Sequence, residues 1–309
     1  MFTRFIALFV LVMLSPLAAN AGTPKVVVSI APVHSLVAGV MDGVAEPELL
    51  LQGNASPHSY MLKPSQVRSL RQADMVVWVG EGVESFLIKP LASLKTKSVF
   101  EVMDLSGMVL LAGRQGGMWD SRQSAHQGHH HDHTSDASMD GHLWLNPNNA
   151  RVMVQALVVR LSQIDAANAD RYRKNGDATL LELSRLDEAL LDQLGPIKQT
   201  PYLVFHDAYQ YLEQHYGLNA VGSVMVDPER KPGAKRLHEI RQKIQQSQVR
   251  CVFAEPQFSG AVTQVIAEGT GLKVGSLDPM GANQTPGKAL YFKLMQGLGE
   301  GLRACLASL

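Results

Sequence analysis

Hydrophobic and polar positions follow two alternating patterns along the first part of the chain. Short runs rich in valine and isoleucine, such as residues 25–30 and 75–79, precede stretches whose apolar residues recur every three or four positions, such as 33–41 and 64–73. The first pattern is typical of buried parallel strands and the second of amphipathic helices. The same alternation adds further segments: strands near 48–51 and 98–102 and a helix near 84–94. These segments predict four βα-type units of an α/β lobe.

The alternation restarts beyond Pro196, after two helical segments. A helix begins at Asn146-Pro147, and a long amphipathic helix covers 166–194, with Gly176 as its weakest point. The later segments are expected as follows: strands near 202–205, 220–225, 252–254 and 272–277, and helices near 209–216, 234–246, 260–268 and 286–305. We therefore expect an α/β fold of two doubly wound lobes, each with a mainly parallel four-stranded sheet, joined by a long rigid linker helix.

The first 21 residues read as a signal peptide. Arg4 precedes an apolar run that ends before Pro16, and Ala19-Asn20-Ala21 fits a cleavage site. No cysteine follows the run, so we expect an exported, soluble periplasmic protein without a lipid anchor. The expected division of the chain is then a signal peptide at 1–21, a first lobe at 22–165, the linker helix at 166–194 and a second lobe at 195–309.

A polar insertion interrupts the first lobe from 113 to 140. It is rich in Gly, Gln, Ser, Asp and His and has hardly any apolar periodicity, which predicts a flexible surface loop. Five of the chain's 11 histidines fall within it: His126, His129, His130, His131 and His133. Imidazoles on such a loop can bind metal, but ordering the loop costs entropy. We therefore expect a weaker, secondary metal site here.

Charge and cysteine content narrow the possible partners. The chain has 28 basic and 28 acidic residues, and losing residues 1–21, which hold Arg4 and no acid, leaves 27 against 28. Such a balance argues against nucleic acid or an anionic membrane as the main partner. Cys251 and Cys305 are the only cysteines, and in an oxidising compartment they most simply form one disulfide. The alternative is two separate buried thiols.

Three isolated histidines and one aspartate are expected where ligands bind in open parallel sheets. His58 lies in the loop after the second strand, and His206 directly follows the strand 202–205. Asp278 follows the last strand of the second lobe, and His142 lies between the insertion and the helix at Pro147. Three neutral imidazoles and one carboxylate suit a four-coordinate zinc ion. Each residue alone also fits a structural role; all four together favour a metal site.

Four motifs resemble, in order and spacing, those of the periplasmic metal-binding receptors of bacterial ABC importers, and the zinc-uptake receptors in particular. They are NASPHSYMLKPSQVRSLRQADMVVWVGEGVESF, DGHLWLNP, FHDAYQYLEQHYGL and FAEPQF. The resemblance covers essentially the whole chain after the signal peptide. It implies two α/β lobes with Zn²⁺ bound between them as transported ligand, delivery to an inner-membrane ABC permease with a cytoplasmic ATPase, and a monomeric protein.

The resemblance also implies roles for individual residues. His58, His142 and His206 match the metal ligands, and related manganese receptors carry a carboxylate in place of His206. Some zinc receptors have a glutamate before the first ligand, where this chain has Pro57. The fourth position is therefore left to Asp278 or to water. The carboxylates expected behind the ligands are Asp207, Glu255 and Asp140, each of which could equally be a helix cap or a surface charge.

Three alternatives stay open at this point. A zinc-dependent hydrolase also uses three histidines and an open position, but the chain has no H-E-x-x-H or G-x-S-x-G motif, and only Glu255 or Asp278 is left as a base. A manganese or iron receptor of the same family is the closer alternative. An adhesin or periplasmic metal buffer is the third. We expect a binding protein and no enzyme.

Overall fold

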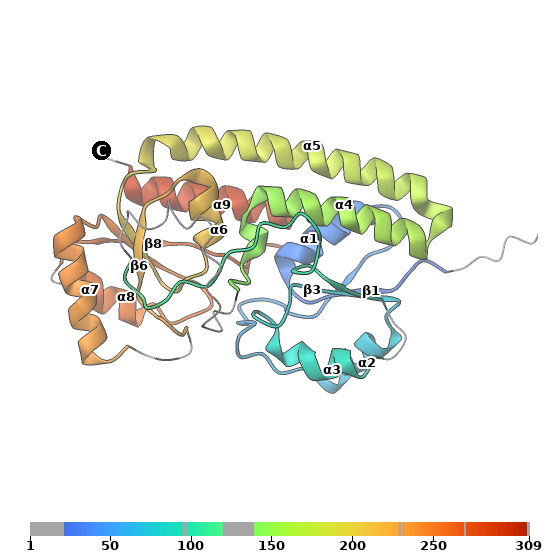
Figure 1. Ribbon diagram of the computed structural model, residues 1–309, viewed down its shortest axis with the longest axis horizontal. Helices are drawn as coiled ribbons and strands as arrows, with labels where there is room; N and C mark the ends of the chain where they lie inside the picture. Colours follow the sequence, from blue (N-terminus) through green and yellow to red (C-terminus); the bar gives the residue numbers. More distant parts are fainter. Residues whose placement is uncertain are drawn as a thin grey trace, which may run out of the picture.

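The computed structural model (Figure 1) describes residues 22–94, 98–119, 139–228, 230, 232–268 and 270–307. The expected signal peptide and the histidines of the insertion lie outside these residues. Within them, no helix has the length and apolar character needed to cross a membrane.

The first lobe is built on a parallel sheet with the strand order β2-β1-β3-β4. Its strands are β1 (Val26–Val28), β2 (Glu48–Leu49), β3 (Met75–Trp78) and β4 (Ser98–Glu101), and its helices include α1 (Ala31–Val40), α2 (Pro64–Gln72) and α3 (Ile88–Ala92). Every residue of β1 and β3 is buried, as their continuous apolar runs predict. The helix expected over 84–94 is shorter, because Pro90 donates no backbone hydrogen bond and is tolerated only in a first turn.

The second lobe repeats the same topology with the strand order β6-β5-β7-β8. Its elements are β5 (Tyr202–Val204), α6 (Gln210–Tyr216), β6 (Ala220–Ser223), α7 (Ala234–Ser247), β7 (Cys251–Ala254), α8 (Ala261–Ala267), β8 (Lys273–Ser276) and α9 (Leu290–Leu306). All its strand pairs are parallel. The predicted fold class, two doubly wound lobes, is therefore confirmed.

Two long helices, α4 (Pro147–Ile164) and α5 (Ala169–Leu194), lie side by side, and α5 runs along both lobes (Figure 1). Gly176 is no weak point: α5 continues through it, and a Cβ there would lie 2.3 Å from Val158 of α4. Helix α9 crosses back to the first lobe, where Ser35 accepts a hydrogen bond from the Tyr291 backbone at 2.9 Å. One continuous core contains buried residues of both lobes, which fixes their relative placement.

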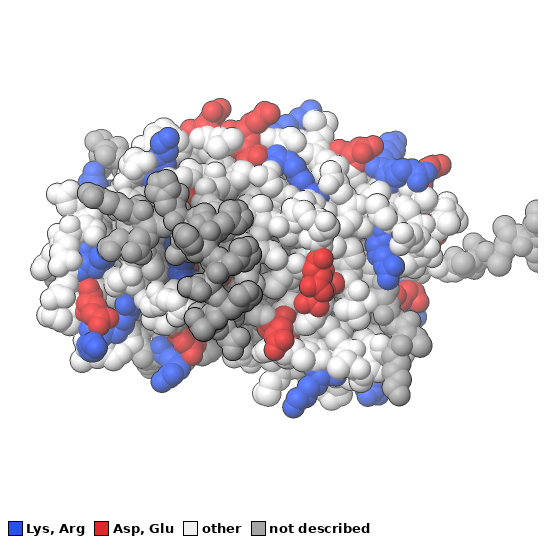
Figure 2. All heavy atoms as spheres, viewed as in Figure 1, with Lys and Arg blue, Asp and Glu red and all other residues white. Residues whose placement is uncertain are grey.

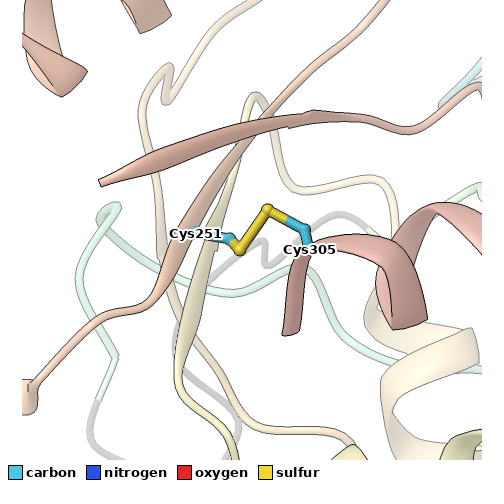
Figure 3. The surroundings of a disulfide bond; sticks show 2 residues. All are labelled: Cys251 and Cys305. Carbon is cyan, nitrogen blue, oxygen red and sulfur yellow. A yellow bond between two sulfur atoms is a disulfide. The ribbon is translucent and has the colours of Figure 1, made fainter. Parts of the chain in front are cut away.

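Cys251 of β7 and Cys305 of α9 form the expected disulfide (Figure 3). Their Cα atoms are 6.1 Å apart, within the normal range for a disulfide. The bond ties the last helix to a central strand across 54 residues of chain. On the chain-entropy estimate such a cross-link contributes about 4 kcal/mol to the free energy of unfolding.

The chain leading into the insertion crosses from the first lobe to the second (Figure 1). Residues 114–119, which we call the strap, lie along the edge strand β6, where Ser223 donates to Gly117 O at 2.8 Å and Trp119 to Val221 O at 3.0 Å. Gly222 permits this approach, because a Cβ there would lie 2.6 Å from the Gly117 oxygen. The expected first lobe includes this segment, but its contacts are with the second.

Candidate metal centre

Three imidazoles from three separate segments meet between the lobes. His58 lies in the loop after β2, His142 precedes the short 3₁₀ turn Leu143–Leu145, and His206 follows β5. One ring nitrogen from each lies within 4.8 Å of the others. The ring centroids are 5.3 to 5.9 Å apart. Nitrogens at this spacing can point to one ion at zinc–nitrogen bond length.

Two of the imidazoles rest against buried carboxylates. Nδ1 of His142 lies 2.8 Å from Asp140 Oδ1, and Nδ1 of His206 lies 2.8 Å from Glu255 Oε1. Each carboxylate accepts a hydrogen bond from Nδ1–H, so the lone pair of each neutral ring is on Nε2. The structure thus places Asp140 and Glu255, two of the carboxylates expected from the sequence, against the Nδ1 atoms of His142 and His206.

A cavity of about 10 Å³ lies among the three rings, which is space for one ion or one water. Its walls come from both lobes: Ser56, Pro57, His58, His142, His206, Glu255, Gln257, Phe258, Pro279 and Met280. The Nε2 atom of His206 is buried and has no hydrogen-bond partner among the residues that the structure describes. A buried lone pair without a partner is costly, and a cation in the cavity would satisfy it.

The pKa values of His58 and His206 are shifted in opposite directions. The pKa of His58 is lowered to about 3, first by burial and then by the nearby His142 and His206. The pKa of His206 is raised: burial lowers it, but the charge and hydrogen bond of Glu255 outweigh burial. His58 is therefore neutral at physiological pH, whereas His206 holds a proton more tightly than an exposed histidine.

Asp278 does not line the cavity. Its Oδ1 accepts hydrogen bonds from Gln257 Nε2 at 2.7 Å and from the Met280 backbone at 3.1 Å. Among the residues that the structure describes, three imidazoles have ligand atoms close enough to share an ion, and Asp278 does not belong to this group. Gln257 was not among the residues expected at the site, although it follows β7 by three residues, a position comparable to those of His58 and His206 after their strands.

Asp207, also expected behind the ligands, faces another group. Asp207 forms a bidentate ion pair with Arg114 of the strap. The Nη1 atom of Arg114 also lies 2.8 Å from Glu213 Oε2. The Arg114 guanidinium stacks 3.6 Å from the centre of the Trp119 ring. Burial raises the pKa of Glu213 to about 7, and the Arg114 charge opposes that rise. These contacts fix the strap next to the residue that follows His206.

The other side of the insertion is fixed as well. The Tyr211 hydroxyl of α6 accepts from the Leu111 backbone at 3.0 Å and donates to Asp140 O at 2.8 Å. Asp140 in turn donates its backbone N–H to Leu111 O at 2.8 Å. Both ends of the insertion, which together we call its stem, are therefore held by the second lobe. Asp140 supports His142 and belongs to this stem.

The face of the molecule in Figure 2 carries basic and acidic side chains interspersed, with no field of a single sign. This agrees with the balanced charge of the sequence. Two doubly wound lobes with an ion-sized, imidazole-lined cavity between them define a class: a solute-binding protein whose ligand is a metal ion.

Comparison with known proteins identifies the family within this class. Residues 26–305 match the family ZnuA, described as "Zinc-uptake complex component A periplasmic". The high-affinity zinc uptake system protein ZnuA of Brucella suis is 36% identical in an alignment of 314 positions that covers 91% of this chain and 91% of that protein. The chain belongs to this family of periplasmic zinc-uptake components, which are binding proteins and not enzymes. The hydrolase alternative is thereby excluded.

Solved structures agree in fold. A crystal structure of ZnuA superposes with a TM-score of 0.76 at 25% identity, covering 92% of this chain and all of that one. A ZnuA deletion mutant with zinc bound also superposes with a TM-score of 0.76, at 23% identity, covering 93% of this chain and 99% of that one.

Proposed function

We propose that this chain captures Zn²⁺ between its two lobes with His58, His142 and His206 as ligands, and that Asp278 or a water fills the fourth position. The observation that carries the proposal is the meeting of three ring nitrogens within 4.8 Å around a cavity of about 10 Å³. Neutral imidazoles suit zinc better than manganese, which prefers oxygen ligands. The zinc-bound structure of a related deletion mutant with the same fold supports zinc as the cargo.

The loaded receptor then docks, as a monomer, on an inner-membrane ABC permease, and the cytoplasmic ATPase drives release and transport. Family membership as a zinc-uptake component supports this partner. The shared core and the helix α5, which runs along both lobes, favour a small rearrangement on loading over a wide hinge motion. From the sequence we also propose a signal peptide at 1–21 and export without a lipid anchor.

The five histidines of the insertion, His126 to His133, are proposed as a weaker, secondary zinc site. They lie outside the described residues, so the support comes from composition and from the stem. Arg114 and Tyr211 hold the stem of the insertion to the second lobe.

A competition titration tests the cargo. Metal-free protein is titrated with zinc in the presence of a chelator of known affinity, and the titration is repeated with manganese. We expect tight, one-to-one binding of zinc at the cavity and much weaker binding of manganese. Manganese that displaces zinc at comparable concentration contradicts the proposal.

A further inference from the structure

Two oxygen-bearing side chains lie at the ends of neighbouring strands beside the three imidazoles. Gln257 follows β7 and Asp278 follows β8, and Gln257 Nε2 donates to Asp278 Oδ1 at 2.7 Å. Gln257 lines the cavity and Asp278 does not. The neutral side chain of this hydrogen-bonded pair is therefore the one nearer to the ion's place.

The loop that carries Asp278 is fixed independently. Trp144 of the first lobe donates its indole N–H to Pro279 O at 2.8 Å, and the Met280 N–H is bonded to Asp278 Oδ1 at 3.1 Å. Pro279 and Met280 are buried and form part of the cavity wall. With the backbone held in this way, the Asp278 carboxylate is oriented by two donors, the Met280 N–H of its own loop and the Nε2 group of Gln257 on the cavity wall.

The amide of Gln257 has only one orientation that fits. A carboxylate oxygen accepts hydrogen bonds, so the NH₂ group must face Asp278 and the carbonyl oxygen must face elsewhere. That oxygen, Oε1, is buried and has no hydrogen-bond partner in the described part of the chain. His206 Nε2 is in the same condition on the same cavity. Two acceptors without donors around one ion-sized space indicate that a cation, or a water bound to it, satisfies both.

The charge balance favours a neutral group at this wall. Asp140 and Glu255 lie directly behind two of the imidazoles, so two negative charges already face a divalent cation across neutral ligands. A third carboxylate in contact with the ion would leave an excess negative charge in a buried site. It would also supply the hard oxygen donor that manganese prefers.

The geometry points to Gln257 as a metal-specificity residue: its NH₂ group tethers Asp278 away from the ion, so that the fourth ligand is a neutral oxygen and zinc is favoured over manganese. The inference rests on the proposed zinc site and decides between the two fourth ligands left open there. In this arrangement Asp278 is the hydrogen-bond partner of Gln257 and is not a ligand. The fourth ligand is a water or the amide oxygen of Gln257.

The test is a double-mutant cycle read by metal competition. Gln257→Leu keeps the side-chain size but removes the tether, so Asp278 can reach the ion; we expect manganese affinity to rise about tenfold relative to zinc. Asp278→Asn added to Gln257→Leu should remove that gain. Asp278→Asn alone should leave zinc affinity unchanged within about threefold, because the carboxylate does not touch zinc in the native protein. Exposed Gln72→Leu is the control substitution.

A spectroscopic readout keeps the test decisive if the Gln257 variant does not fold. The protein and its Asp278→Asn variant are loaded with Co²⁺, whose visible absorption reports coordination. Identical spectra are expected. A changed spectrum, or a tenfold loss of zinc affinity in Asp278→Asn, shows that Asp278 is already a ligand and overturns the inference, as does an unchanged metal preference in Gln257→Leu. Retained zinc binding after loss of the histidines would instead overturn the proposed site.

Discussion

His142 and His206 are held very differently from His58. His142 and His206 are buried and each is fixed through Nδ1 by a carboxylate at 2.8 Å. His58 is only partly buried, and neither of its ring nitrogens has a hydrogen-bond partner within the described part of the chain. In the proposed site, His142 and His206 are thus preorganised ligands and His58 is an adjustable one. The two anchored rings form a preformed half, and the loop that carries His58 would complete the coordination.

The comparison also separates the proton chemistry of the ligands. The raised pKa of His206 follows from Glu255, whereas the pKa of His58 at about 3 follows from burial and two neighbouring rings. His206 therefore releases a proton on metal binding only at pH values below its raised pKa, and His58 has none to release there.

Loss of a ligand should produce the largest effect. His206→Ala removes an anchored imidazole and leaves the buried Glu255 carboxylate without its ring partner. We expect zinc affinity to fall by more than about 100-fold, which exceeds the usual effect of losing a group that only supports a ligand. His58→Ala should cost less, because a water can replace a ligand on a partly exposed loop. Chelator competition measures both, with exposed His238→Ala of α7 as the control. Equal losses at the two positions would contradict the division into anchored and adjustable ligands.

Removal of the charge behind an anchored ring comes next. Glu255→Gln and Asp140→Asn keep an acceptor for Nδ1–H but remove the negative charge, and we expect zinc affinity to fall by about 10- to 100-fold in each. Exposed Asp192→Asn of α5 serves as the matched control. Circular dichroism confirms that the variants fold. An unchanged affinity in both variants would show that the carboxylates contribute to structure alone.

Protons should compete with zinc mainly at His206. The pKa of His206 is raised above the ordinary value of 6.5. Zinc affinity is therefore highest above this raised pKa, and it falls as the pH decreases through it, by up to about tenfold per pH unit for one proton. His58, with a pKa of about 3, adds no competition above about pH 4. Titrations between pH 8 and pH 5 measure the decrease. In Glu255→Gln the decrease should begin at lower pH, and a decrease at the same pH in both proteins would assign it to another group.

The sequence predicted those features that depend on pattern and chain order. Buried runs followed by helices defined both sheets, and parallel strands place His58 and His206 at their carboxyl ends, where the structure has them. The paired cysteines gave the disulfide. The orientation of Asp278 was beyond the sequence, because it is set by Gln257 and by Trp144, 135 positions away from Pro279 in the chain. The same holds for the partner of Asp207, which is Arg114 on a segment that crosses between lobes.

The smallest change in affinity is expected from the most conspicuous histidines. Deleting Ala125–Asp136 removes all five histidines of the insertion but keeps Arg114, Trp119 and Asp140, the contacts that hold its stem to the second lobe. Because His142 and His206 keep their carboxylates, the affinity of the tight site should stay within about twofold while the total number of bound zinc ions decreases. Equilibrium dialysis with metal analysis gives the stoichiometry, and chelator competition gives the affinity. Loss of tight binding would mean that the insertion supplies a ligand, and the preformed half of the site would then have to include it.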